Sequence, residues 1–330
     1  MTEVRHIKPN DTRGRAAIAA FLATQGLSFD PRVQFSVAVY DDQEQVVATG
    51  SFDHQIIKCV AIADSQRGLN LAGTVVTQLI SEQYRRGITH VFVYTKPSHG
   101  AIFEALGFYL IVQTAAVALL ENKRHGVADY LASLTHPPVV ATERVAGIVM
   151  NANPFTLGHR HLVVKASQAQ DRVHLFMVAA DLSDFSTQTR YELIQAGIAD
   201  LPNVYLHQGG DYMISPATFP SYFLKDTAHI VEAHAGLDME LFCQRIAKPL
   251  GITTRYVGSE PTCVVTNHYN QVMKDVALQH NLHIEELPRL TVDGQAVSAS
   301  RVRQLLAEGD LDAIKPLVPP TTYAWLTQAR

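Results

Sequence analysis

The sequence predicts two domains, an α+β domain with a mixed sheet followed by an α/β domain with a parallel sheet. Three observations support this fold class. At 330 residues the chain exceeds a typical single domain. Its second half alternates β-like and helical segments, whereas its first half opens with several β-like segments in succession. We therefore expect a first domain at residues 1–130, a linker at 131–143 and a second domain at 144–330.

The first half begins with a predicted hairpin, because two β-like segments flank the polar turn at 41–44. Strands are expected at 36–40, 46–52, 56–63 and 90–95, and a helix at 74–86. This order is typical of a mixed α+β sheet. Pro137 and Pro138 favour extended backbone beyond this half, which is why we place the linker around them.

The second half reads as a series of β-α-β units. Strands are expected at 144–150, 173–179, 203–207, 253–258 and 283–287. Helices are expected at 159–170, 189–200, 240–250 and 266–280. Such alternation predicts a Rossmann-like parallel sheet with helices on both faces. Ligands of such sheets bind at the carboxyl ends of the strands.

A phosphate-binding turn is predicted directly after the first of these strands, in Asn151-Ala-Asn-Pro-Phe-Thr-Leu-Gly-His159. The first N–H groups of a helix lack partners within the helix and carry the positive end of its dipole, so anionic oxygens bind there. Gly158 allows close backbone approach, and Thr156 and His159 can face one phosphate. A surface histidine at a helix start is the simpler alternative for this segment alone. The other residues expected to line the nucleotide are Asn151, Asn153, Pro154 and Phe155.

A second anion-binding segment is predicted near the C-terminus, in Val297-Ser-Ala-Ser-Arg-Val-Arg303. Ser298 is a good N-cap, so the segment begins a helix that offers hydroxyl and N–H groups. Arg303 stays charged at any working pH and can bind phosphate oxygens through two N–H groups. Arg303, with Ser298 and Ser300, is therefore expected to bind phosphate oxygens. A well-capped surface helix remains the alternative for this segment alone.

Two further turns follow predicted strands. Gly258, Ser259 and Glu260 are expected to contact adenine and ribose, although an ordinary turn with a solvated glutamate would look the same. The polar run 181–186 with Arg190 could approach a ligand or a partner, or it is simply a capped helix with Ser186 or Thr187 at its start.

The composition excludes several classes of protein. A formal net charge of −4 and the lack of a Lys/Arg run argue against a nucleic-acid partner. No stretch reaches the ~18 apolar residues needed to span a bilayer and the N-terminus lacks a signal sequence, so we expect no membrane association and a cytoplasmic location. Cys59, Cys243 and Cys263 lack CxxC spacing and are expected to be free thiols. The histidines lack HExxH spacing, so no metal ion held by the protein alone is expected.

The two anion-binding segments resemble the (H/T)xGH and ISSTxxR signatures of the nucleotidyltransferase superfamily, with Thr156 in place of the usual first histidine. In the first half, residues 66–73 and Leu106-Gly-Phe108 resemble the GNAT acyltransferase fold. Arg67, Gly68, Asn70 and Ala72 match its pyrophosphate loop, and Asn70 stands where that family usually has glycine. A GNAT-shaped domain without transfer activity is the alternative for this half.

A GNAT-like half followed by a nucleotidyltransferase half resembles the citrate lyase ligase family over nearly the whole chain. The resemblance implies ATP and Mg²⁺ as cofactors, acetate as substrate, and the acyl carrier (gamma) subunit of citrate lyase as partner. The thiol of its phosphoribosyl-dephospho-coenzyme A arm would be acetylated through acetyl-adenylate, with release of AMP and diphosphate. His159, Thr156 and Arg303 would be catalytic, and the GNAT-like loop would bind the arm.

Three other functions remain open. One is an adenylyltransferase acting on phosphopantetheine or a pyridine mononucleotide. The second is an N-acetyltransferase whose other half senses a nucleotide, and the third is a nucleotide-binding adaptor without enzymatic activity.

Overall fold

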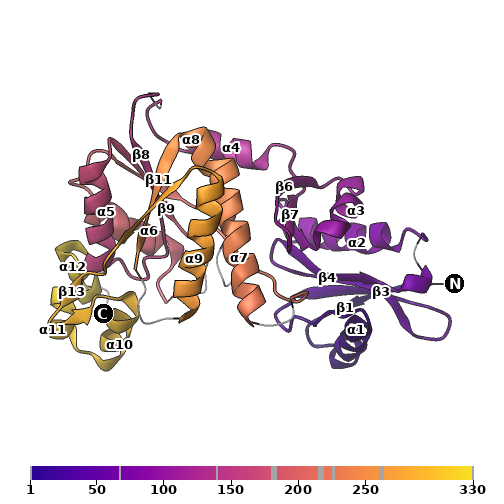
Figure 1. Cartoon of the computed structure of the whole chain (residues 1–330). Coiled ribbons are helices and arrows are strands. Elements are labelled where there is room, and N and C mark those ends of the chain that lie inside the picture. The colour runs from indigo at the N-terminus through magenta and orange to yellow at the C-terminus, as the bar shows by residue number, and fades with distance from the viewer. Residues whose placement is uncertain are drawn as a thin grey trace. The chain divides into compact units, whose positions relative to one another are not determined.

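The computed structural model describes residues 2–66, 68–138, 140–179, 184–214, 219–224, 227–259 and 264–328 (Figure 1). The chain forms two compact units, Met1–Gly126 with Pro220–Ala233, and Val127–Phe219 with His234–Arg330. The first unit contains a mixed sheet and the second a parallel sheet, so the predicted fold class is confirmed. No helix among the described residues is both long enough and apolar enough to cross a bilayer.

The first unit is built on a sheet of order β1-β2-β3-β4-β5-β7-β6 in which β4 and β5 run parallel and the other neighbours antiparallel. Its strands are β1 Glu3–Ile7, β2 Phe35–Tyr40, β3 Val46–Asp53, β4 Ile56–Ile62, β5 Phe92–Thr95, β6 Tyr109–Gln113 and β7 Ala118–Glu121. Its helices are α1 Thr12–Thr24, α2 Leu71–Arg85 and α3 Gly100–Ala105. The hairpin β2–β3, the third strand and helix α2 confirm the predictions, whereas β1, β6, β7 and α1 were not predicted.

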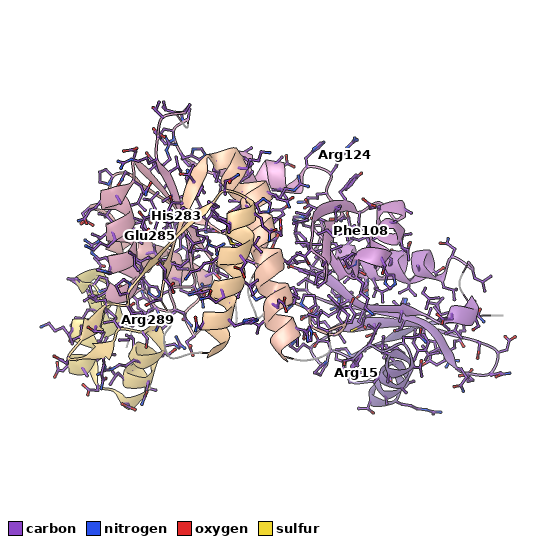
Figure 2. The ribbon with its side chains drawn as sticks, viewed as in Figure 1. Arg15, Phe108, Arg124, His283, Glu285 and Arg289 are labelled. Carbon is purple, nitrogen blue, oxygen red and sulfur yellow. The ribbon has the colours of Figure 1, made fainter. Side chains whose placement is uncertain are left out.

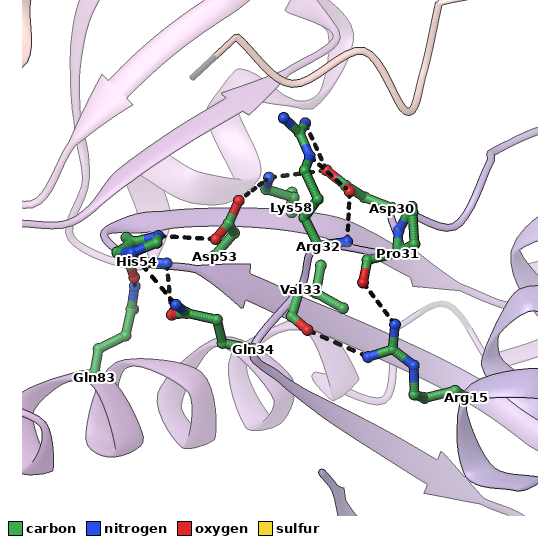
Figure 3. Close-up of polar contacts among 10 residues, drawn as sticks. All are labelled: Arg15, Asp30, Pro31, Arg32, Val33, Gln34, Asp53, His54, Lys58 and Gln83. Carbon is green, nitrogen blue, oxygen red and sulfur yellow. Dashed lines mark hydrogen bonds and ion pairs between the residues drawn. The ribbon is translucent and has the colours of Figure 1, made fainter. Parts of the chain in front are cut away.

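A buried lysine ties one loop of the first unit to its sheet (Figure 3). Lys58 on β4 is 1% exposed, and its Nζ lies 3.0 Å from Asp30 Oδ2 and 3.1 Å from Asp53 Oδ2. A buried charge is tolerated only when it is paired in this way. Arg32 also pairs with Asp30, at 3.1 Å, and Arg15 donates to the carbonyl of Pro31 at 2.8 Å. These contacts fix the loop that carries Asp30 to Arg32 against β4.

The segment around Tyr222 completes the first unit. β4 and β5 pair only at Ile56–Phe92 and Ile57–Val93, so the next groups of β5 need other partners. The Tyr222 hydroxyl donates to the Tyr94 carbonyl at 3.2 Å. The N–H of Ser28 donates to the Tyr222 carbonyl at 2.9 Å. Residues far along the chain are therefore part of the core of this unit.

The second unit is built on a fully parallel sheet of order β10-β9-β8-β11-β12. Its strands are β8 Val145–Met150, β9 Arg172–Met177, β10 Val204–Gln208, β11 Ile252–Gly258 and β12 His283–Leu287. The helices of the chain from residue 126 onward are α4 Gly126–Ser133, α5 Leu157–Ala169, α6 Thr187–Gly197, α7 Thr227–Leu241, α8 Lys248–Leu250, α9 Val264–Gln279, α10 Ala299–Glu308, α11 Leu311–Ile314 and α12 Pro320–Gln328. A short hairpin, β13 Thr291–Val292 with β14 Gln295–Ala296, precedes α10.

Helices cover both faces of this sheet, as predicted. Successive strand residues point to opposite faces. Leu175 of β9 belongs to a core cluster with Val163 of α5. The next residue, Phe176, instead packs edge-on against Phe242, which begins a π-helical turn, Phe242–Ala247, between α7 and α8. The helix predicted at 240–250 thus has a π turn in its middle, and the helical segment leading into it begins at Thr227. The N-terminal part of the segment that begins at Thr227 lacks the apolar stripe on which the prediction relied.

Candidate functional site

The predicted strand, turn and helix are present at the carboxyl end of the central strand β8, and Thr156 is the N-cap of α5. The cap is reciprocal. The Thr156 hydroxyl accepts a hydrogen bond from the backbone N–H of His159 at 3.4 Å, and the Thr156 N–H donates to His159 Nδ1 at 3.1 Å. The threonine hydroxyl also lies 2.9 Å from Nδ1. Thr156 is only 1% exposed, so its hydroxyl orients the imidazole from within the turn.

This cap decides which nitrogen of His159 carries the proton. Because Nδ1 accepts from the backbone, the proton of the neutral ring is on Nε2, which becomes a hydrogen-bond donor. Burial, with a further contribution from the positive charge of Arg289, lowers the pKa of His159 to about 4. At neutral pH the site therefore presents a neutral, oriented N–H donor. The ring lies nearly parallel to that of Phe155, with 5.9 Å between centroids.

The two predicted anion-binding segments meet, although they lie 150 residues apart in the chain. Arg303 Nη1 donates to the carbonyl of Asn153 at 2.7 Å, and Nη2 lies 3.4 Å from Ser300 Oγ. Ser298 caps α10, since its hydroxyl accepts from the N–H of Arg301 at 3.2 Å. A Cβ on Gly158 would lie 3.1 Å from the carbonyl oxygen of Val297, a tight contact, so glycine lets the two segments approach closely there.

A carboxylate pairs with the cation at this meeting point. Asp184 Oδ2 lies 2.8 Å from Arg303 Nε and 3.4 Å from Asn153 Nδ2. The Asp184 side chain is 67% exposed, so the ion pair is weak and can be exchanged for another anion.

Sequence reasoning missed Arg289, which follows β12 (Figure 2). Its Nε donates to the carbonyl of Ser259 at 2.9 Å, and the Ser259 N–H donates to the carbonyl of Leu287 at 2.8 Å. The turn at Gly258 and Ser259 therefore lies beside Arg289 at the carboxyl ends of β11 and β12. The signal in the sequence that could have indicated Arg289 is its position after a strand of a parallel sheet, where ligands bind. Glu260 lies outside the described residues.

The remaining loop residues differ in exposure. Asn151 is exposed, whereas Asn153 is 7% exposed and its side-chain oxygen accepts from the N–H of Phe185 at 3.1 Å. Pro154 is buried beside it. Phe155 has no exposed surface and belongs to the core of the second unit, so we assign it to packing beneath the loop rather than to ligand contact. Ser186 caps α6, because its hydroxyl accepts from the N–H of Thr189 at 3.1 Å. This agrees with the simpler alternative for residues 181–186, the start of a capped helix.

The GNAT-like loop belongs to the first unit. Arg67 lies outside the described residues. Gly68 and Asn70 both have positive φ, +91° and +54°, and Asn70 precedes α2. Asparagine tolerates this left-handed conformation better than most residues, which explains how it can stand in place of glycine. A Cβ on Gly73 would lie 2.6 Å from Asn70 Oδ1, so the asparagine side chain lies over the first turn of α2, which also contains Ala72.

Among the residues that the structure covers, no group of three or more His, Cys, Asp or Glu side chains could hold a metal ion. Cys59 and Cys243 are free and buried, and Cys263 is outside the described part of the chain.

A parallel sheet with a capped anion-binding turn after its central strand, and an arginine helix that returns to that turn, defines an α/β unit of the nucleotidyltransferase type. Residues 145–326 match the family described as the citrate lyase ligase C-terminal domain. The chain belongs to the citrate lyase ligase family.

Similar proteins span nearly the whole chain. A [citrate [pro-3S]-lyase] ligase of Haemophilus influenzae is 42% identical, covering 94% of this chain and 94% of its own. One of Escherichia coli K12 is 41% identical, covering 97% of this chain and 92% of its own. Among solved structures, an acetyltransferase of the GNAT family from Staphylococcus aureus MU50 is 10% identical and covers 37% of this chain and all of that one, at a TM-score of 0.31.

Proposed function

We propose that this chain is an ATP-dependent ligase that converts acetate to acetyl-adenylate and transfers the acetyl group to the thiol of the citrate lyase acyl carrier subunit. The contact between Arg303 and the Asn153 carbonyl carries the proposal, because it joins a fixed cation to the turn that leads into α5. Membership of the citrate lyase ligase family supports it, since relatives over most of the chain are named as ligases. The need for ATP suits the cytoplasmic location expected from the sequence.

In the first step a carboxylate oxygen of acetate attacks the α-phosphorus of ATP, and the bond to the diphosphate oxygen breaks. Acetate is already a nucleophile, so the reaction needs alignment and relief of negative charge rather than a base. His159 would donate its Nε2–H to the α-phosphate. Arg303, Ser298 and Ser300 would bind the departing diphosphate, and Thr156 would hold the imidazole in place.

Mg²⁺ bound with ATP would neutralise charge on the phosphate oxygens, which would be its main ligands. Among the described residues, Asp184 is exposed and already pairs with Arg303, so we propose that the nucleotide itself carries the cation.

In the second step the carrier thiol gives up its proton and attacks the acetyl carbonyl, and the bond to AMP breaks. The products are the acetyl thioester and AMP. We propose that Arg67, Gly68, Asn70 and Ala72 bind the pyrophosphate of the phosphoribosyl-dephospho-coenzyme A arm. The positive φ of Gly68 and Asn70 supports this, since such turns expose backbone N–H groups to anions.

Isotope exchange between diphosphate and ATP tests the first step. Exchange that depends on acetate is expected. Exchange that depends instead on phosphopantetheine or nicotinamide mononucleotide would support an adenylyltransferase. If none of these compounds supports exchange, the function that remains is that of an N-acetyltransferase or a nucleotide-binding adaptor.

The role of His159 is tested in the same assay. His159→Ala should lower the exchange rate by about 100-fold, the usual effect of one preorganised donor. His161→Ala, two residues along the same helix, is the matched control and should be near normal. Equal rates in the two variants would remove His159 from its role.

Arm binding is tested with the whole chain, because Pro220–Ala233 is part of the first unit. Calorimetry with dephospho-coenzyme A should give measurable heat, and Asn70→Asp should weaken binding by adding a negative charge to the loop. Asn281→Asp is the matched control, since Asn281 has a similar φ of +55° in the other unit. No heat at millimolar ligand in the unaltered protein would contradict arm binding here.

A further inference from the structure

One arginine of the second unit is completely buried at the edge of the sheet where the loop begins. Arg190 on α6 is 0% exposed and is among the largest side chains with no exposed surface. Its Nη1 lies 2.9 Å from the carbonyl oxygen of Asn151 and 2.7 Å from that of Val178. Its Nη2 lies 3.2 Å from Thr187 Oγ1. The guanidinium therefore joins residues that follow two different strands.

The end of the β8–β9 ladder explains why an arginine is needed there. The last backbone contact of the pair runs from the N–H of Val178 to the carbonyl of Met150, at 3.0 Å. Beyond it the carbonyls of Asn151 and Val178 have left the ladder and accept hydrogen bonds from Arg190 instead. Arg190 serves both, because a guanidinium carries several donors in a fixed plane.

Arg190 also fixes the side chain of Asn151. Nη1 lies 2.6 Å from Asn151 Oδ1, and arginine can only donate, so this atom must be the amide oxygen. The two N–H donors of the amide consequently point away from Arg190, on a residue that is exposed at the start of the phosphate turn. The orientation of this amide is therefore set by Arg190.

We propose that Arg190 is a positioning residue that sets the backbone at Asn151 and turns its amide donors toward the nucleotide phosphates. Arg190 does not touch the ligand and acts through Asn151. The inference rests on the proposed function, because it assigns the ligand of this turn as a nucleotide.

The chain provides a matched control in Arg172, at the opposite end of β9. Arg172 is 4% exposed, donates to the carbonyls of Pro137 and Pro138, and pairs with Glu143. It begins β9, whereas Val178 follows the last residue of that strand. The two arginines are alike in burial and in binding carbonyls, but only Arg190 contacts the phosphate turn. A purely structural role would make their variants alike.

The experiment compares Arg190→Lys with Arg172→Lys in the full chain. Both should lower the melting temperature. Only Arg190→Lys should lower kcat of acetate-dependent exchange, by about 100-fold as expected for a misplaced reacting group, and weaken ATP binding in calorimetry. Parallel changes in both variants, or normal exchange in Arg190→Lys, would overturn the inference.

A double-mutant cycle then tests the route through Asn151. Asn151→Ala should lower kcat without the loss of melting temperature, and adding Arg190→Lys to it should cost little more, since residues that act as one unit are not additive. Additive losses would contradict the inference.

If the Arg190 variants do not fold, Thr187→Val removes one partner of Arg190 and should lower kcat several-fold, about the effect of one hydrogen bond. An unchanged kcat there would also count against it.

The ligase activity and the role of Arg190 are tested by different measurements. Absence of acetate-dependent exchange in the unaltered protein would remove the proposed ligase activity. ATP binding measured by calorimetry would still show whether Arg190→Lys differs from Arg172→Lys.

Discussion

Arg303 donates to the carbonyl of Asn153 at 2.7 Å, which joins helix α10 to the turn after β8. The same guanidinium pairs with Asp184 at 2.8 Å. Its position is therefore set from two sides, while a weak, exposed pair leaves it able to accept an anion.

We expect Arg303→Gln to lower acetate-dependent exchange by about 100-fold, because the departing diphosphate loses its fixed charge. Arg301→Gln, two residues earlier on the same helix, is the control and should stay within about 3-fold. Steady-state exchange at several ATP concentrations separates kcat from KM. If the two variants lose equal activity, Arg303 has no special place in the site.

The pH dependence of exchange follows from the cap on His159. Its folded pKa, about 4, is below the ordinary value of 6.5, so the ring stays neutral across pH 5.5–8. The rate should therefore show no step from this histidine near pH 6.5. Nitrogen NMR of the imidazole checks the assignment directly, since a proton on Nε2 and a bare Nδ1 are expected at pH 7. A titration near pH 6.5 would contradict it.

The stability linked to His159 has a definite sign. Between pH 6.5 and about 4 the unfolded chain binds a proton that the folded protein does not. The contribution of the neutral ring is thus fully present above pH 6.5 and is lost as the pH falls through about 4.

The sequence contained enough information for the strands of the parallel sheet and for the start of α5. Alternating apolar segments mark β8 to β12, and the Thr156 cap with Gly158 marks where the helix begins. These are local properties, decided within a few residues. The candidate site could be predicted from the sequence for the same reason, because ligands of such sheets bind at strand ends.

Contacts between distant segments were not predictable in this way. Nothing local links Asp184 to Arg303, or Tyr222 to Tyr94 of the first unit. Arg289 lies in no recognisable motif, and its importance follows from the neighbouring turn at Ser259. The sequence places Arg190 beside a polar run, but its hydrogen bond to Asn151 depends on where two strands end.

The buried cluster of the first unit predicts a response to acid. Burial alone would raise the pKa of Asp30, but hydrogen bonds from Arg32 and the charge and hydrogen bond of Lys58 outweigh it and lower that pKa from 3.8 to about 2. A lowered carboxylate pKa gives stability that is present above pH 3.8 and lost as the pH falls through about 2. The shift corresponds to about 2 kcal/mol.

Asp30→Asn should therefore lower the free energy of unfolding of the first unit at pH 7, measured in urea, by about 2 kcal/mol. The difference from the unaltered protein should shrink below pH 4. Asp42→Asn, at an exposed site between β2 and β3 of the same unit, should change little at either pH. A difference for Asp30→Asn that persists unchanged at pH 2 would show that its cause is not the ionised carboxylate.

The packing of α6 against the phosphate turn gives the last prediction. A Cβ on Gly197 would lie 2.5 Å from Phe155 Cε1 and 2.7 Å from Cδ1. Phe155 is fully buried and lies parallel to His159, so the ring cannot move without disturbing the imidazole. Gly197→Ala should lower stability by about 1–3 kcal/mol through overpacking, despite the better helix propensity of alanine, and should lower acetate-dependent exchange.

Gly236→Ala is the control for this change. Gly236 lies within helix α7, and a Cβ there would meet nothing within 4 Å. That variant should be neutral or more stable, by up to about 1 kcal/mol. Adding Phe155→Leu to Gly197→Ala should restore part of the melting temperature, because the smaller side chain makes room for the methyl group. If Gly197→Ala melts at or above the temperature of the unaltered protein with full exchange activity, close contact between α6 and Phe155 does not govern the site.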